Sequence, residues 1–215
     1  AAKLEATELD LILVATVSPD HMLPACALLV QQAIGATKAA AYDLNAACSG
    51  FLTALTTGEA FIAAGTARNV LVIGAETLSR FLDIQDRGSC ILFGDGAGAA
   101  ILETTTTPDV GVLGNLLGAD GVNAELLHCV AGGSAQPASE QTLRDRQHFL
   151  RMNGKEVFKL AVRVMADSCE RVLTACGKHS DDVAWFIPHQ ANIRILEAVA
   201  DQLHVGLDRF PINLD

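Results

Sequence analysis

Hydrophobic positions in the first third of the chain fall into strand-length apolar runs separated by helical patterns. Three nearly continuous apolar runs occupy residues 9–16, 39–44 and 69–75. Runs of this length and character are expected for parallel strands that are buried on both faces. Two segments with helical periodicity lie between them, residues 25–34 and 49–64, and each is followed by a glycine that can end a helix. The order strand, helix, strand, helix, strand predicts an α/β layered sheet.

The second half of the chain repeats this logic. A long amphipathic pattern at residues 154–176 precedes an apolar, strand-like run at 183–188. A helical pattern at 193–203 and a further apolar run at 210–214 follow. If the halves are copies, the run at 210–214 corresponds to the one at 39–44.

The middle of the chain has a different character. Residues 89–102 read as two strand-like runs around a glycine-rich bend, where backbones would pass closely. Four consecutive threonines at 104–107 are followed by Pro108, and this polar, turn-forming run is the best boundary between halves. We therefore predict two domains, residues 1–107 and 108–215. The segment 130–140, rich in Ala, Gly, Ser and Pro, is expected to be an exposed loop.

Composition narrows the range of functions. Half of the 215 residues are apolar, which allows a large core, and the net charge of −10 argues against nucleic acid as a partner. No stretch has the length of a membrane span and no signal-peptide pattern is present, so a cytosolic protein is expected. The six cysteines form no Cys-x-x-Cys pair, which indicates reduced thiols and neither a zinc site nor a disulfide framework.

Cys48 lies where the predicted strand 39–44 meets the helix that follows it. At the start of a helix, unpaired N–H groups and the positive end of the helix dipole are expected to lower the pKa of a thiol and favour the nucleophilic thiolate. Small neighbours, Ala47, Ser49 and Gly50 among them, leave the approach to the sulfur clear. Most free cysteines are small buried hydrophobes, and spacing alone leaves both interpretations open.

His189 ends the predicted strand 183–188, and ligands and catalytic groups collect at strand ends in open α/β sheets. A single histidine is more often structural than catalytic. In the repeat, however, its strand corresponds to a strand of the first half that neighbours the strand and helix around Cys48. This correspondence favours a functional role for His189.

Lys155, Lys159 and Arg163 recur at every fourth residue, so they form a basic stripe on one face of the predicted helix 154–176. Such a stripe can bind an acidic partner. It can equally be a solvated helix face with a few charges.

Five segments together resemble a known family. They are residues 45–51 (NAACSGF), 86–88 (DRG), 93–99 (FGDGAGA), 153–159 (NGKEVFK) and 188–194 (PHQANIR). In this order they resemble β-ketoacyl-ACP synthase III, a condensing enzyme of the thiolase superfamily, and the resemblance extends from about residue 9 to residue 215. It implies a thiolase-like α/β fold of two pseudo-repeated βαβαβ halves in an α/β/α/β/α arrangement, incomplete here.

The resemblance also implies roles for individual residues. Cys48 matches the acyl-accepting nucleophile and His189 the catalytic histidine. Other positions match sites near CoA and its pantetheine arm (Arg87, Phe158, Asn192), the acyl pocket (Leu23, Phe93) and the carrier-protein docking surface (Lys159, Arg194), to which the stripe adds Lys155 and Arg163. Asp201 and Gln202 stand where relatives often carry lysines, so a smaller docking patch is expected.

The implied reaction is a decarboxylative condensation that initiates fatty-acid synthesis. Cys48 takes an acyl group from acyl-CoA as a thioester. Malonyl-ACP then loses CO₂, and the resulting enolate, stabilised by hydrogen-bond donors, attacks the thioester to give β-ketoacyl-ACP. The resemblance implies a cytoplasmic homodimer whose partners are acyl carrier protein and acyl-CoA, with no metal or other cofactor and with neither nucleic acid nor membrane as a partner.

Several parts of the family pattern fall outside the chain. A third catalytic residue, an asparagine, would follow Asp215, and a tryptophan partner of Arg87 would precede Leu4. We therefore expect a polypeptide that is truncated at both ends and is itself inactive. Two alternatives to fatty-acid initiation stay open: a polyketide-type condensing enzyme, and a catalytically inactive, truncated or dimer-partner protein of the same fold.

Overall fold

A computed structural model describes residues 3–108 and 110–214. Contacts within the chain divide it into two compact units: residues 1–78 with 94–113, and residues 79–93 with 114–215. The segment 79–93 therefore groups with the second unit although it lies within the first half of the sequence. The domain boundary predicted at 107/108 stays a prediction.

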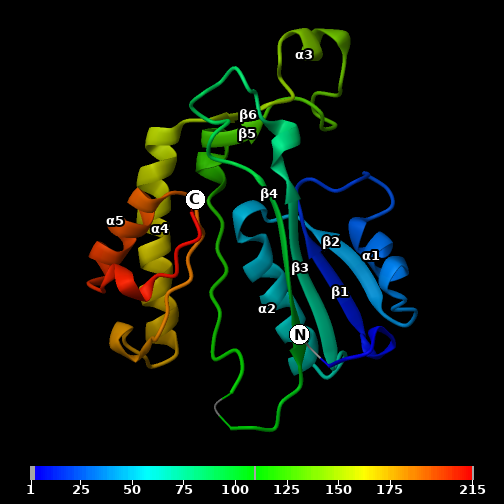
Figure 1. The fold of residues 1–215 in the computed structure, drawn as a ribbon, viewed down its shortest axis with the longest axis vertical. Helices are drawn as coiled ribbons and strands as arrows, with labels where there is room; N and C mark the ends of the chain where they lie inside the picture. Colours follow the sequence, from blue (N-terminus) through cyan, green and yellow to red (C-terminus); the bar gives the residue numbers. More distant parts are fainter. Residues whose placement is uncertain (1–2, 109, 215) are drawn as a thin grey trace. The chain divides into compact units, whose positions relative to one another are not determined.

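The first unit is built on a four-stranded sheet (Figure 1). Its strands, in the spatial order β2-β1-β3-β4, are β1 (Leu11–Ala15), β2 (Ala40–Leu44), β3 (Asn69–Thr77) and β4 (Asp95–Glu103). The first three are parallel and β4 runs antiparallel to β3. Every residue of the central strand β1 is buried, which explains its unbroken apolar sequence.

Helices α1 (Cys26–Ile34) and α2 (Gly50–Ala63) cover opposite faces of this sheet. Successive side chains of a strand point to opposite faces. Leu13 of β1 accordingly belongs to the core cluster that contains Ala54 of α2. Val14, the next residue, belongs to the cluster that contains Ala27 of α1. The predicted strand-helix order of this region is confirmed.

Asp43 of β2 fixes the start of α1. Its two carboxylate oxygens accept hydrogen bonds from the backbone N–H groups of Cys26 and Ala27, each at 2.7 Å. Negative charge at a helix start is favourable because the first N–H groups have no partner within the helix. At the other end, Gly35 adopts φ +74°, the left-handed conformation that ends many helices.

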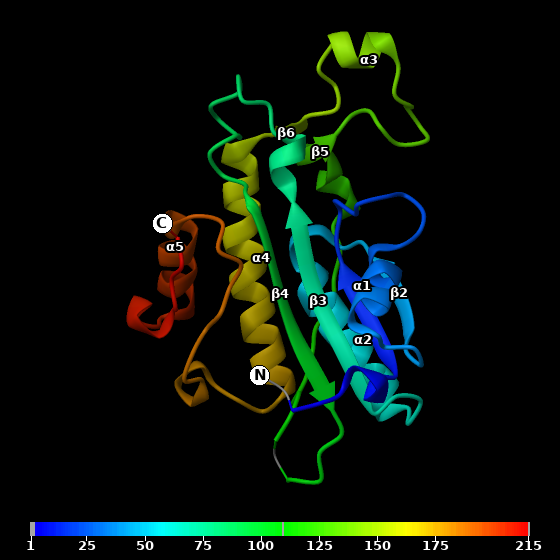
Figure 2. The same ribbon diagram turned by 45° about the vertical axis from the view of Figure 1, so that its right-hand side comes forward.

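The second unit is dominated by two helices that lie side by side, α4 (Gly154–Ala175) and α5 (Ile193–Leu203) (Figure 2). Their shared core includes Val162 of α4 and Val199 of α5. Shorter elements complete this unit: 3₁₀ turns at Gly121–Leu126, Ser180–Asp182 and Leu207–Arg209, strands β5 (Leu127–Cys129) and β6 (Leu150–Met152), and helix α3 (Glu140–Arg144). Within the described residues, no helix is long and apolar enough to cross a membrane.

Three predicted strands are wrong. Residues 183–188 and 210–214 are irregular, although they lie together through a hydrogen bond from the Phe186 N–H to the Arg209 carbonyl at 2.9 Å and through stacking of the Phe186 and Phe210 rings at 5.4 Å. Of the two runs predicted in residues 89–102, only the second forms a strand, because turns at residues 88–92 satisfy the backbone groups locally.

Candidate functional site

Cys48 lies at the carboxyl edge of the sheet in the first unit. Strands β1, β2 and β3 are parallel, so their carboxyl ends share one edge. Cys48 follows β2 at this edge, within a single 3₁₀ turn, Ala47–Ser49, and α2 begins directly after that turn. Ligands bind at this edge in open α/β sheets.

The backbone of this turn is held in an uncommon conformation. Ala47, just before Cys48, has φ +45°, which costs a residue with a Cβ about 1 to 3 kcal/mol and is found most often at functional sites. The N–H and hydroxyl of Ser49 both donate to the carbonyl of Ala46, at 3.1 and 3.0 Å, and close the turn. The Cys48 side chain is exposed.

Gly50 allows the turn to sit directly on β1. A Cβ added at this glycine would lie 3.0 Å from the Cβ of Ala15, which is tighter than most real Cβ contacts. Ala15 is the last residue of β1 and is buried. The small residue at position 50 therefore sets how closely the start of α2 approaches the sheet.

The pKa of the Cys48 thiol is raised from its ordinary value. Desolvation is the main cause, a hydrogen bond with the backbone of Cys48 itself opposes it, and the negative charge of Glu76 raises the pKa further. The predicted lowering by the helix start is therefore wrong, because one short turn does not outweigh desolvation. Desolvation also raises the pKa of Cys26, Cys129 and Cys169, so position, not pKa, distinguishes Cys48.

Glu76, near the end of β3, organises the same edge. Its carboxylate accepts hydrogen bonds from the Val17 N–H at 2.9 Å and from the hydroxyl of Ser18. The Ser18 oxygen in turn accepts the Thr77 N–H at 2.8 Å. The loop after β1 is thus tied to the end of β3, on the edge that carries Cys48.

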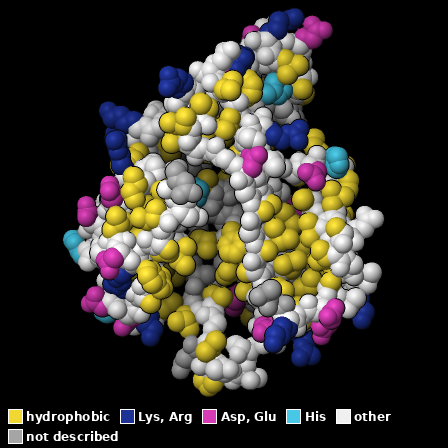
Figure 3. Space-filling view, in the orientation of Figure 1, with side chains coloured by type: hydrophobic (Ala, Val, Ile, Leu, Met, Phe, Trp, Pro, Cys, Tyr) yellow, Lys and Arg dark blue, Asp and Glu magenta, His cyan; other side chains and the backbone are white. Residues whose placement is uncertain are grey.

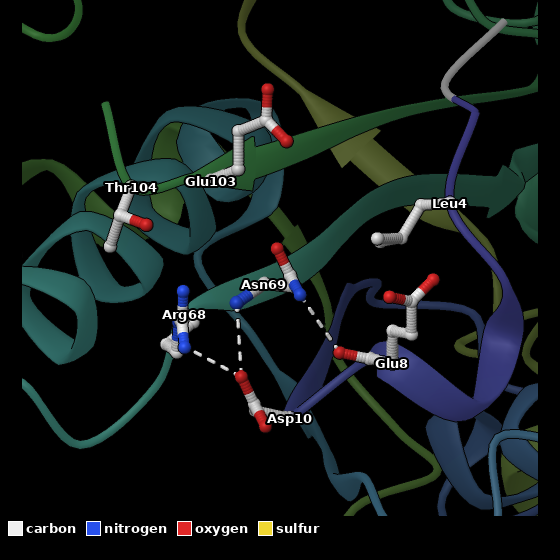
Figure 4. A pocket seen from close by; sticks show the side chains of 7 residues that line it. All are labelled: Leu4, Glu8, Asp10, Arg68, Asn69, Glu103 and Thr104. Carbon is white, nitrogen blue, oxygen red and sulfur yellow. Dashed lines mark hydrogen bonds between the residues drawn. The ribbon is translucent and has the colours of Figure 1, made fainter. Parts of the chain in front are cut away.

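A polar hollow of about 510 Å³ lies at the opposite edge of this sheet (Figure 4). Its lining residues are Leu4, Glu8, Asp10, Arg68, Asn69, Glu103 and Thr104. The backbone N–H groups of Arg68 and Asn69 donate to Asp10 at 2.8 and 3.0 Å and hold the pKa of its carboxyl below the usual value. These bonds join the starts of β1 and β3, so we interpret the hollow as structural.

His189 lies in the second unit, in the irregular segment that leads into α5. Its side chain is exposed, and desolvation lowers the pKa of its imidazole, which favours the neutral ring. The next residue, Gln190, ties the segment down: its amide nitrogen donates to the carbonyls of Pro188 and Pro211 at 3.1 and 3.2 Å, and its oxygen accepts the Asn213 N–H at 3.3 Å.

Two residues predicted to lie near pantetheine also have structural roles. The side chain of Asn192 accepts the Ile195 N–H at 3.1 Å and so caps the start of α5. Phe158 of α4 is half-buried against the core that α4 and α5 share. Both residues therefore stabilise the helices beside His189, whatever else they bind.

Arg87 occupies an exposed position in the turn at residues 83–90 of the second unit. Its side chain makes no hydrogen bond or ion pair with any residue that the structure describes. Asp83, in the same turn, is only 4 % exposed and pairs with Arg146. This ion pair holds the pKa of Asp83 at about 2.

The predicted docking residues are exposed. Lys155, Lys159 and Arg163 lie on α4 and Arg194 on α5. The ammonium of Lys159 pairs with Glu156 at 2.9 Å, which neutralises part of the stripe. On the face drawn in Figure 3, Lys and Arg side chains lie in small groups rather than in one large patch.

The two predicted acyl-pocket residues differ in exposure. Leu23 is 87 % exposed in the loop before α1, and Phe93 is half-buried just before β4. Their units are not placed relative to one another, so the pocket stays a prediction. The described residues contain no group of three or more His, Cys, Asp or Glu side chains that could hold a metal ion.

Four residues whose bonds fix the segments around the candidate site residues were not found from the sequence: Glu76, Gln190, Asp83 and Arg146. Glu76 carried a usable signal, because it is an acid at the carboxyl end of an apolar strand, on the edge predicted to carry the chemistry. Asp83 and Arg146 are 63 residues apart, and no local pattern links them.

A parallel-stranded α/β unit with a cysteine on a strained turn at the carboxyl edge defines the class: the fold is thiolase-like. Models of the 3-oxoacyl-[acyl-carrier-protein] synthase III family and of its C-terminal region match residues 42–121 and 173–215. The chain belongs to this family. The predicted family and fold class are thereby confirmed.

Individual relatives agree with this assignment. The chain is 47% identical over 213 residues to a β-ketoacyl-[acyl-carrier-protein] synthase III of Natranaerobius thermophilus, covering 98% of this chain and 65% of the relative. It is 49% identical over 214 residues to one of Desulfitobacterium hafniense, covering 100% of this chain and 64% of the relative. The chain thus spans a little under two thirds of the length of these curated relatives.

Solved structures show the same fold. The 3-oxoacyl-[acyl-carrier-protein] synthase III of Aquifex aeolicus superposes with a TM-score of 0.87 at 41% identity, covering 98% of this chain and 63% of that one. The priming β-ketosynthase of the R1128 polyketide pathway superposes with a TM-score of 0.85 at 32% identity, covering 98% and 61%.

Proposed function

We propose that the gene product condenses an acyl-CoA primer with malonyl-ACP and so initiates fatty-acid synthesis. The observation that carries the proposal is the position of Cys48: an exposed thiol beside a strained residue, at the carboxyl edge of a thiolase-like sheet. In the proposed first step the sulfur attacks the thioester carbonyl of acyl-CoA, the C–S bond to CoA breaks, and CoA leaves as its thiol.

The raised pKa of Cys48 favours the protonated thiol over the thiolate in the resting protein. A base must therefore accept its proton as the thioester forms. We propose His189 for this proton, because desolvation lowers the pKa of its imidazole and so favours the neutral ring that can accept one. The ring then returns the proton to the departing CoA sulfur and is neutral again. In the second step the neutral ring donates a hydrogen bond to the enolate oxygen that forms when malonyl-ACP loses CO₂.

Binding of the substrates is proposed to follow the predicted residues. Arg87 offers an unpaired cation to the nucleotide end of CoA, while Phe158 and Asn192 lie near the pantetheine arm. Leu23 and Phe93 contribute to the acyl pocket. No metal or other cofactor takes part in this scheme, and a cytoplasmic location with the substrates is proposed with it.

A homodimer is proposed because the first unit presents a free strand. In the described sheet β2 is an edge strand with three partly buried and two exposed residues. The exposed Met22 and Leu23 precede α1, which packs beside β2. Unpaired edges of this kind invite pairing with another strand. Sedimentation of the full-length gene product as a monomer at micromolar concentration would count against the dimer.

The proposed function is tested by separating its half-reactions in the full-length gene product. His189→Ala is expected to lose decarboxylation of malonyl-ACP by about 10² to 10³-fold. Cys48→Ala is expected to lose condensation entirely while retaining malonyl-ACP binding. Carbon dioxide release and β-ketoacyl-ACP formation, followed by mass spectrometry, report the two steps. Undiminished condensation in Cys48→Ala would overturn the proposal.

Docking of acyl carrier protein is proposed on the basic residues of α4 and α5. Acyl carrier protein and this chain are both acidic, so a local basic patch is needed to bring them together. Lys159→Glu or Arg194→Glu is expected to raise the KM for malonyl-ACP severalfold and to affect acyl transfer from CoA less. An unchanged KM with unchanged salt dependence would place docking elsewhere.

The polyketide alternative has one observation in its favour, the likeness to the R1128 priming β-ketosynthase. Identity to that protein is 32%, against 47 and 49% to the two bacterial β-ketoacyl-[acyl-carrier-protein] synthases III. Competition between malonyl-ACP of fatty-acid synthesis and malonyl-loaded polyketide carrier protein would discriminate the two. A preference for the polyketide carrier would favour the alternative.

A further inference from the structure

The turn that carries Arg87 is held by successive hydrogen bonds. The carboxylate of Asp83 accepts the Gln85 N–H at 2.9 Å, and that of Asp86 accepts the Gly88 N–H at 3.0 Å. The hydroxyl of Ser89, a residue only 2 % exposed, donates to Asp86 at 2.7 Å. Bonds on both sides of Arg87 leave the backbone of the turn little freedom.

A charged pair anchors this turn to a distant part of the second unit. The guanidinium of Arg146 donates through Nε to one oxygen of Asp83 at 3.0 Å and through Nη2 to the other oxygen. Two parallel bonds between a planar fork and a carboxylate fix orientation as well as distance. The side chain of Asp83 is 6 % exposed and that of Arg146 is 38 % exposed.

Arg146 is itself held from several directions. Its guanidinium lies over the ring of Phe149, 4.9 Å from the centroid. Its backbone has φ +55°, and its carbonyl accepts a bond from Nη2 of Arg151 at 3.0 Å. A non-glycine residue persists in this conformation only where its surroundings stabilise it, and such residues cluster at functional sites.

A neighbouring pair in the same region lacks these features. Arg144 contacts Glu140 at 3.4 Å, with side chains 66 and 89 % exposed. Exposed pairs on a helix contribute little to stability. Arg144 and Arg146 therefore lie close in the sequence and carry the same charge, but only Arg146 forms an ion pair with the turn that carries Arg87.

We propose that the Asp83–Arg146 pair is a positioning device that presents Arg87 to the nucleotide end of CoA. The inference rests on the proposed function, because CoA is the proposed donor. A turn fixed before binding loses less conformational freedom when the ligand arrives, so a free cation on it binds more tightly. Asp83 and Arg146 act through Arg87 and need not touch the substrate.

The test compares two acyl donors that differ only in the nucleotide. In the full-length gene product, Asp83→Asn and Arg146→Gln are expected to raise the KM for acyl-CoA by about fivefold or more and to leave that for the matching acyl-pantetheine within about twofold. Arg144→Gln is the control and is expected to change neither. A merely structural role would raise both KM values together, and that result would overturn the inference.

A double-mutant cycle asks whether the pair works through Arg87. If it does, Asp83→Asn added to Arg87→Gln weakens acyl-CoA binding no further, whereas independent effects would multiply. Calorimetric binding of CoA itself repeats the comparison without any chemistry. If the variants lose CoA affinity but the protein never becomes acylated on Cys48, the proposed function is refuted and the inference stands. If Asp83→Asn and Arg87→Gln weaken binding independently, or if CoA binding is unchanged in Asp83→Asn, the inference alone is refuted.

Discussion

The two regions that carry the proposed catalytic residues are built differently. In the first unit, Cys48 follows a regular strand, and parallel strands β1 to β3 bring their ends to the same edge. In the second unit, His189 follows the irregular segment 183–188. Among the residues that the structure describes, one backbone hydrogen bond, from the Phe186 N–H to the Arg209 carbonyl, links this segment to the chain after α5. Backbone hydrogen bonds position the first residue, and side chains position the second.

In the second unit, side-chain contacts take the place of the backbone hydrogen bonds that two paired strands would make. Arg209 donates to the carbonyls of Ser180 and Val183, and its guanidinium lies 5.3 Å from the Phe186 ring centroid. Gln190 bonds the segments before and after α5. A region held this way depends on a few side chains, so single substitutions should harm it more than the first unit.

The largest effect is expected for Phe186→Ala. Phe186 is 7 % exposed, stacks on Phe210 and belongs to the core of α4 and α5. Removing a buried ring costs about 3 to 5 kcal/mol. Hydrogen exchange should accelerate in α5 and stay slow in β1.

Trp185→Ala is the control for this prediction, because the neighbouring tryptophan is 59 % exposed. It should change hydrogen exchange in α5 much less. Equal effects of the two substitutions would show that the packing of Phe186 does not hold the segment.

A smaller loss is expected in the first unit for Gly50→Ala. The new methyl would lie 3.0 Å from the Cβ of Ala15, which cannot rotate away, so one of the two segments must shift at a cost of about 1 to 3 kcal/mol. Urea denaturation measures the loss. Alkylation of Cys48 should change with it, because the turn rests on this contact.

Gly58→Ala in the same helix is the matched comparison. Its added Cβ would also meet atoms at 3.0 Å, but these are terminal methyls of Leu102 and Val70, which can move more easily than a Cβ. Alanine also favours a helix interior by about 1 kcal/mol over glycine. A loss at Gly58 as large as that at Gly50 would contradict the special role given to the Ala15 contact.

The sequence predicted strands β1 to β3 and helices α1 and α2 well, because the strands are nearly continuous apolar runs and a glycine follows each helix. The expected burial on both faces holds for β1 but not for β2, because β2 lies at the edge of the described sheet. The helical pattern predicted at about residues 193–203 agrees with α5, and in the structure the side chain of Asn192 caps its start. The runs 183–188 and 210–214 look equally strand-like. In the structure, however, Arg209 donates to the carbonyl of Val183, and Gln190 donates to the carbonyls of Pro188 and Pro211. Apolar character alone does not tell a strand from an irregular buried segment.

The candidate site was predictable in part. Cys48 and His189 were found from their positions after apolar runs and from family motifs. The direction in which the pKa of Cys48 shifts was not predicted, because desolvation of the sulfur depends on which parts of the folded chain lie near it. Arg146 pairs with Asp83 across 63 residues, a separation that short-range spacing cannot reveal, whereas Glu76 could have been recognised as an acid at the end of an apolar strand.

The smallest effect is expected from Glu76→Gln, which removes a negative charge that raises the Cys48 pKa. The pKa of the thiol should fall, so the midpoint of its alkylation by iodoacetamide moves to lower pH. Glu103→Gln removes the same charge at the opposite edge of the sheet and should leave the midpoint in place. A midpoint that stays or rises in Glu76→Gln would contradict the proposed electrostatic link.

The most direct test of the central claim is where an acyl group attaches. The full-length gene product would be incubated with acetyl-CoA or a longer acyl-CoA, digested at acidic pH to preserve thioesters, and mapped by mass spectrometry. The account predicts one acyl group on Cys48, absent from Cys48→Ala and removed when malonyl-ACP is added. An acyl group on Cys90 or Cys129 with Cys48 unmodified would contradict it.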